Sequence, residues 1–313
     1  MATTHLQWID NLKGIAILMV IAHHFGLARQ EYFQWFHTGQ GVSIFLFCSA
    51  YVLADKQDFL STFRMKRMLQ RILTPMFLCT LFLILTSCFF LPIGQVLETC
   101  LHGAGLGPGS YFPWLYILFW VCLPFFKKLY SICDNAILSF FAFSIVCAAL
   151  ECIFSLVSTH IDYEVASNIW RVLPLRYLMI IYAGLSFHHF EKHKQISISL
   201  FFVCGGLAWL DIPPPHSHSY INSWGWHGYH WFTVLYVVPL VLVLKKFRHR
   251  FLEYLGKYSY EIFIVQMMVF YTVNTFGIAR YPTYSSIFRI IQLLLLITLS
   301  YITIKIKQRR QLL

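Results

Sequence analysis

Three ionisable side chains in the first apolar segment have the types and the spacing for proton transfer. The segment WIDNLKGIAILMVIAHHF carries Asp10, Lys13 and His24. Lys13 and His24 are separated by about three turns of α-helix, so both lie on one helix face, roughly 16 Å apart along the axis. Asp10 shares that face, whereas His23 points about 100° away from His24. Imidazole is the side chain best suited to proton transfer near neutral pH. The other interpretation is a histidine that packs between helices and forms a hydrogen bond with a neighbour.

Apolar runs of the length of membrane helices must position these side chains. A hydrocarbon core about 30 Å thick needs roughly 20 apolar residues per helix, and ionisable groups inside such helices usually mark function. The runs are centred near residues 14–28, 39–54, 72–92, 112–126, 136–157, 172–187, 196–210, 231–244, 259–276 and 286–304. The sequence therefore predicts an all-α polytopic membrane protein of about ten transmembrane helices, with residues 1–313 as a single transmembrane domain.

The distribution of basic residues predicts how these helices are oriented. With the N-terminus inside, 19 of the 24 Lys and Arg residues fall on the inner side and five on the outer side. Cytoplasmic loops of membrane proteins carry such an excess, so both termini are predicted to be cytoplasmic. The same rule accounts for the net charge of +11. No basic stripe has the aromatic spacing of an RNA-binding surface, which argues against nucleic acid as a partner.

The composition excludes several classes of protein and of site. Hydrophobic residues make up 58% of the chain and charged residues 12%, whereas soluble domains have about 25% charged residues. A water-soluble globular domain is therefore excluded. The nine Cys residues include no CxxC and mostly lie inside apolar runs, which is typical of small buried side chains rather than of disulfides or zinc ligands. The outer loop 211–230 has HxH and HxxH patterns. Its many Trp and Tyr residues favour sugar stacking or a position at the membrane interface over a metal site, so no metal is predicted.

Four segments follow one another in a characteristic order. The first segment has a basic residue, then ten residues, then His; the basic residue here is Lys13 and the histidine is His24. The other three segments read GVSIFLFCSAYVLADK, FRMKRMLQRILTPMF and LGKYSYEIFIVQ. Together they resemble the acyltransferase-3 family of integral membrane acyltransferases, whose later motifs read GVxxFFxxSGY, Arg-xx-Arg-Ile-xx-Pro and LGxxSYxIYLxH. The chain differs from the family at Ala50, where the family has Gly, and at Gln266, where it has His.

The resemblance implies an O-acyltransferase. Such enzymes transfer an acyl group, usually acetyl from acetyl-CoA, to a hydroxyl of a bacterial surface polysaccharide or its lipid-linked precursor. His24 matches the residue regarded as the catalytic base, which takes the hydroxyl proton as the oxygen attacks the thioester; an acyl-His24 intermediate is the alternative. Asp10 and Lys13 complete the predicted catalytic set. The basic residues Lys66, Arg67 and Arg71, with Lys13, are expected to bind the CoA phosphates, although the positive-inside rule explains them equally well.

Five further side chains are predicted to line the substrate site. Ser49 and Tyr51 are expected to orient the acceptor or polarise the thioester carbonyl, with helix packing through small residues as the alternative. Gln266 is expected to line the cavity as a hydrogen-bond donor. Trp114 is a further candidate, and Arg176 is expected to face a cavity because an unpaired charge inside a span is costly.

Topology and resemblance together predict transmembrane acyl transfer in the bacterial plasma (inner) membrane. Acyl-CoA would enter from the cytoplasm, the carbohydrate acceptor would approach from the outer face, and membrane lipid surrounds the helices. The alternatives are an enzyme that transfers another acyl group, such as succinyl, and a polysaccharide-precursor exporter or flippase. Fold alone does not separate these functions, but an exporter has no need of a base at His24.

Overall fold

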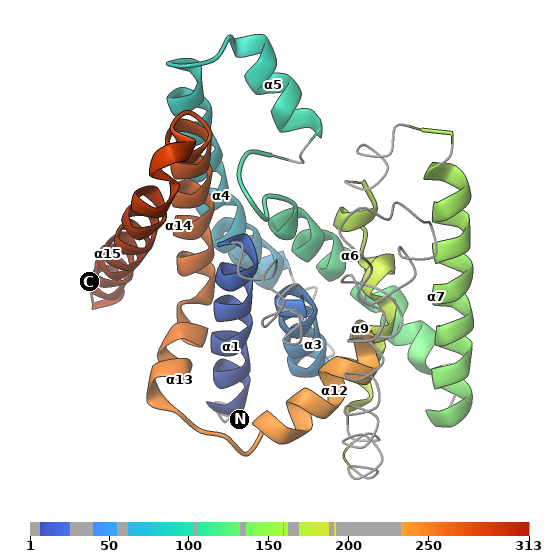
Figure 1. The fold of residues 1–313 in the computed structure, drawn as a ribbon. Helices are drawn as coiled ribbons and strands as arrows, with labels where there is room; N and C mark the ends of the chain where they lie inside the picture. The colour runs from blue at the N-terminus through green and yellow to red at the C-terminus, as the bar shows by residue number, and fades with distance from the viewer. Residues whose placement is uncertain are drawn as a thin grey trace. The chain divides into compact units, whose positions relative to one another are not determined.

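Most of the chain that the structure describes is helical. The structure is a computed structural model, shown in Figure 1. It describes residues 7–25, 40–54, 62–102, 105–131, 136–158, 160–161, 169–187, 191 and 233–312. These ranges contain no β-strand, which confirms the all-α prediction for them. Every predicted apolar run overlaps a described helix except 196–210, which lies outside the described residues.

Two compact units make up the chain: the first comprises residues 1–59 and 115–257, and the second residues 60–114 and 258–313. The helices of the first unit are α1 (Gln7–His24), α3 (Gly41–Leu53), α7 (Ala136–Ser158), the short η3 (Pro174–Tyr177), α9 (Leu178–Leu185), α12 (Thr233–Leu244) and α13 (Arg250–Lys257). Helix α6 (Tyr111–Ser131) begins in the second unit and continues into the first. That residues 1–313 form a single transmembrane domain stays a prediction.

Glycines bring the helices of the first unit into close contact. A Cβ at Gly256 in α13 would lie 1.8 Å from the Asp10 carbonyl oxygen, and one at Gly14 in α1 would lie 2.2 Å from the Leu252 carbonyl oxygen. A Cβ at Gly184 in α9 would lie 2.7 Å from the Cβ of Ala50 in α3. Small residues allow such backbone approach in membrane helix bundles, where close packing drives association. In Figure 1, α13 (orange) lies beside the first turns of α1 (dark blue).

The second unit is built on two long helices and on a third helix that packs against both. Its helices are α4 (Thr62–Cys88), α5 (Ile93–His102), α14 (Ser259–Thr272), the π-helical η5 (Val273–Ile278), η6 (Pro282–Tyr284) and α15 (Ser285–Leu312). Helix α14 packs against both α4 and α15. Lys307 of α15 forms an ion pair with Glu261 of α14 and lies over the Tyr258 ring. These contacts join the start of α14 to the last turns of α15.

Among the described residues, four helical segments are long and apolar enough to cross a membrane: Met65–Cys88, Tyr111–Ser131, Ser259–Ile278 and Pro282–Arg309. Large apolar side chains on these helices face outward, among them Phe77 (67% exposed) and Ile297 (67% exposed). Such surfaces are incompatible with water but suit lipid. The protein is therefore a membrane protein. The number of ten spans and the cytoplasmic position of both termini stay predictions.

The described helices also differ from the predicted runs in where one of them begins and in two short helices that were not predicted. Helix α1 begins at Gln7 rather than near residue 14, because its polar first turns are packed against α13. Those polar side chains keep α1 out of the set of helices that are apolar enough to span by composition alone. The short helices α5 and α13 were not predicted, because a hydropathy window of membrane length averages over them.

Candidate functional site

One unbroken helix, α1, carries the three side chains predicted to do the chemistry. Asp10 and Lys13 lie in its first turns and His24 is its last residue, so the predicted single helix is confirmed. Lys13 Nζ lies 3.9 Å from Asp10 Oδ1, and the Asp10 side chain is only 12% exposed. The charge pair and the imidazole therefore occupy opposite ends of the helix, roughly 16 Å apart along its axis.

Helix α13 holds the charged end of α1 in place. Gly256 lies against the Asp10 carbonyl and Gly14 against the Leu252 carbonyl, so the two backbones touch. The Asn11 side chain adds a polar link, since its Oδ1 accepts a hydrogen bond of 3.2 Å from the His249 backbone N–H. Sequence reasoning missed these positioning residues. The sequence signal that could have identified them is the pair Gly14 and Gly256, because an isolated glycine within a helix usually allows close packing.

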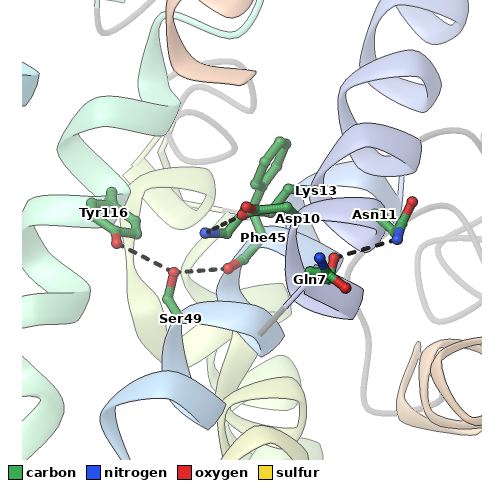
Figure 2. Close-up of polar contacts among 7 residues, drawn as sticks. All are labelled: Gln7, Asp10, Asn11, Lys13, Phe45, Ser49 and Tyr116. Carbon is green, nitrogen blue, oxygen red and sulfur yellow. Dashed lines mark hydrogen bonds and ion pairs between the residues drawn. The ribbon is translucent and has the colours of Figure 1, made fainter. Parts of the chain in front are cut away.

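A second group of polar side chains lies on the side of α1 that Asp10 and Lys13 face. Ser49 Oγ donates a hydrogen bond of 2.9 Å to the Phe45 carbonyl and lies 3.3 Å from the Tyr116 hydroxyl. In Figure 2, Asp10 and Lys13 leave α1 on the side of Phe45 and Ser49. Both functions of Ser49 considered from the sequence remain open: its hydroxyl joins α3 to α6, and it lies on the charged side of α1.

Tyr51 belongs to an aromatic cluster at the start of α1. Its ring centroid lies 5.0 Å from that of Trp8 and 5.7 Å from that of Phe187. The Lys245 ammonium lies over two of these rings, 5.1 Å from the Trp8 centroid and 5.5 Å from the Phe187 centroid. Trp8 and His24 are separated by nearly the whole of α1, about 24 Å along its axis. The structure thus groups Tyr51 with the charged end of the helix and not with His24.

His24 lies at the far end of α1 beside a second imidazole. The His23 and His24 ring centroids are 5.2 Å apart and the rings meet edge to face. His24 is half-buried whereas His23 is exposed, in keeping with the predicted difference in direction. Arg176, also in the first unit, lies in η3 immediately before α9 and is half-buried.

The residues predicted to bind the CoA phosphates lie together on α4 in the second unit. Lys66, Arg67 and Arg71 are all exposed, so their charged groups are accessible to a ligand. Pro75 follows within the same helix, and because proline lacks an N–H, the Arg71 carbonyl has no helical donor. One residue further on, the Ile72 carbonyl accepts a hydrogen bond of 2.6 Å from the Tyr260 hydroxyl of α14.

The remaining two predicted substrate residues also lie in the second unit. Trp114, in the first turn of α6, is 44% exposed. Gln266, on α14, is fully buried, and within the described structure neither amide atom has a hydrogen-bond partner. The structure therefore distributes the predicted set over two units. The first contains Asp10, Lys13, His24, Ser49, Tyr51 and Arg176, and the second contains Lys66, Arg67, Arg71, Trp114 and Gln266.

No metal site is found among the described residues. No group of three or more His, Cys, Asp or Glu side chains there has the geometry to hold an ion. The four histidines of the predicted outer loop, His216, His218, His227 and His230, lie outside the described residues. Among the described groups, the imidazole is of the type suited to acid–base catalysis and the cations of α4 are of the type suited to binding anions.

Comparison with known protein families assigns the chain to one of them. A family model described as an acyltransferase domain matches residues 6–305, which is essentially the whole chain and spans both units. The chain matches no curated protein and no solved structure. With the apolar helices, the match makes the chain a membrane acyltransferase, and it belongs to the acyltransferase-3 family.

Proposed function

We propose that the protein transfers an acetyl group from acetyl-CoA to a hydroxyl of a surface carbohydrate or of its lipid-linked precursor. Membership of the acyltransferase-3 family over residues 6–305 carries this proposal. The described side chains support it, because they include an imidazole, a partly buried charge pair on the same helix, and a separate group of cations on α4.

In the proposed reaction, His24 is the general base. Its neutral imidazole takes the proton of the acceptor hydroxyl while the oxygen attacks the thioester carbonyl carbon. The carbon–sulfur bond breaks as the new carbon–oxygen bond forms. The leaving thiolate then takes the proton from the imidazolium, which yields CoA, the carbohydrate ester and neutral His24. This direct transfer needs no covalent enzyme intermediate.

The cations of α4 are proposed to hold the donor. CoA carries phosphates at one end, and the guanidinium groups of Arg67 and Arg71 are suited to bind them in a bidentate fashion. Lys66 adds positive charge for the same anion. Exposure of the three α4 side chains supports this role. The donor enters from the cytoplasm in this scheme, because these three cations belong to the predicted inner side.

The acceptor is proposed to reach His24 from the outer face of a bacterial plasma membrane. Support comes from α1 itself, which separates Lys13 from His24 by about three helical turns, or roughly half the thickness of a hydrocarbon core. Ser49, Tyr51, Trp114, Arg176 and Gln266 are the proposed substrate-contacting residues of this scheme.

A strain that carries His24→Ala separates the enzyme from an exporter. The acyltransferase predicts that the polymer still reaches the cell surface but lacks its ester groups, measured by base-labile acetate per sugar unit. Loss of the polymer itself, with normal esterification of what remains, would support transport and contradict the proposal. His23→Ala is the matched control, since it removes the neighbouring, exposed imidazole and keeps His24.

A further inference from the structure

A carboxamide is buried without a hydrogen-bond partner in the second unit. Gln266 is 0% exposed, and within the described structure neither its Nε2 nor its Oε1 has a partner. Phe263 and Phe270, which lie on the same face of α14, are buried too. An amide in such surroundings has lost its water without compensation. A ligand that offers both a donor and an acceptor would restore both hydrogen bonds.

Contacts between α4 and α14 determine how far Gln266 lies from the α4 cations along the two helices. The Tyr260 hydroxyl meets the Ile72 carbonyl, one residue after Arg71, and the Tyr271 and Ser87 hydroxyls meet further along both helices. The two helices therefore run in the same direction. Gln266 lies six residues beyond Tyr260, about 9 Å along the axis of α14. A ligand that touches both Arg71 and Gln266 must extend along this helix pair by about that length.

The pantetheine arm of an acyl-CoA has this extent and this chemistry. It joins the phosphates to the thioester through two secondary amides, each with one N–H donor and one carbonyl acceptor. The Gln266 carboxamide has the complementary acceptor and donors. Two amide-linked units and the cysteamine end reach on the order of 10 Å when extended. The hydroxyls of a sugar ring carry no charge that would account for the neighbouring cations.

We infer that Gln266 binds an amide of the pantetheine arm, with α4 and α14 forming the donor subsite of the second unit. The inference rests on the proposed function, since it assumes an acyl-CoA donor. It also gives a reason for a carboxamide at this position, where the resemblance leads one to expect His. A secondary amide pairs with a carboxamide through both of its polar atoms, whereas a neutral imidazole offers one donor and one acceptor on opposite edges.

A glycine-rich segment packs beside Gln266 in the second unit. Gly105, Gly107 and Gly109 all have positive φ, a conformation that side chains other than Gly rarely adopt. A Cβ at Gly107 would lie 3.2 Å from the Met267 carbonyl oxygen and 3.5 Å from Leu83 Cδ1. This non-helical segment thus lies against α14 next to Gln266 and against α4.

Binding to the purified full chain in detergent tests the inference without any acceptor. The probes are CoA and phosphate-free pantetheine, measured by calorimetry for the wild type, Gln266→Met and Arg71→Gln. Gln266→Met keeps the length of the side chain but removes its hydrogen bonding. It is expected to raise the Kd of both probes about tenfold, as for one net hydrogen bond. Arg71→Gln is expected to raise the Kd of CoA alone. Met267→Leu, which changes a buried apolar neighbour on α14, is expected to change neither.

The outcomes distinguish the inference from the proposed function. Unchanged affinity in Gln266→Met, with weaker CoA binding in Arg71→Gln, overturns the inference and leaves the proposed function standing. Equal losses in Gln266→Met and Met267→Leu also overturn it, because they indicate a packing defect. Wild-type protein that binds neither probe counts against the proposed function and therefore against both. Thermal unfolding of the ligand-free variants completes the test: Gln266→Met is expected to be at least as stable as the wild type, since it removes an unsatisfied amide.

Discussion

The substitution Gly256→Ala adds a methyl group where α13 touches α1. The new Cβ would lie 1.8 Å from the Asp10 carbonyl oxygen and 2.6 Å from its carbonyl carbon. An ordinary contact between carbon and carbonyl oxygen is about 3.3 Å, so the two helices must separate by roughly 1.5 Å. The obstructing atoms belong to the backbone, so rotation of a side chain cannot relieve the overlap.

This separation is expected to lower both stability and activity. Overpacking of this kind costs about 1–3 kcal/mol of unfolding free energy, and a backbone clash belongs at the upper end. Asp10 and Lys13 move with α1, and a displacement of about 1 Å in a catalytic group costs on the order of 100-fold in rate. Thermal unfolding of the detergent-purified protein and CoA release from acetyl-CoA in the presence of acceptor measure the two effects.

Gly94→Ala is the matched control for this substitution. A Cβ at Gly94, in α5, meets nothing within 4 Å, and Ala has the higher helix propensity. This variant is therefore expected to retain the stability and rate of the wild type. If Gly256→Ala unfolds at the same temperature as Gly94→Ala and releases CoA equally fast, the account of how α13 positions α1 is wrong.

Three further substitutions test other parts of the account. Arg71→Gln is expected to raise the KM for acetyl-CoA about tenfold with kcat unchanged, as for one lost charge-assisted hydrogen bond. Lys128→Gln, at an exposed cation of α6, is the control and is expected to change neither constant. Equal KM values for Arg71→Gln and the wild type in steady-state kinetics would contradict phosphate binding. Asp10→Asn removes the charge that pairs with Lys13 and is expected to lower the free energy of unfolding by about 1–3 kcal/mol, measured by thermal unfolding. Unchanged stability would mean that the ion pair does not stabilise the folded protein. Tyr260→Phe removes the hydrogen bond of 2.6 Å to α4 and is expected to cost about 1 kcal/mol, so an unfolding temperature equal to that of the wild type would refute its role in joining α14 to α4.

Periodicity predicted the part of the site that lies within one helix. Asp10, Lys13 and His24 share α1, and spacing along a single helix is a local property that sequence determines. Contacts between helices were not predictable in this way. Nothing in the residue types indicated that Trp8 and Phe187 would surround Tyr51, because the three residues come from different helices or their ends.

The division of the chain into two units was also beyond sequence reasoning. Hydropathy identifies helices but does not say which of them pack together, and the second unit combines residues 60–114 with residues 258–313. Only the packing of α4 against α14 relates the basic residues near position 70 to Gln266. Burial of Gln266 without a partner is likewise a property of the folded chain.

Release of CoA by the purified protein tests the central claim most directly. Acetyl-CoA is supplied with a panel of glycans and lipid-linked glycans, and the wild type is compared with His24→Ala and His23→Ala. The account predicts release that depends on the acceptor, falls by about 10²–10⁴ in His24→Ala, and persists in His23→Ala. Equal rates in the wild type and His24→Ala would contradict it, because the acyl transfer would then not depend on this imidazole.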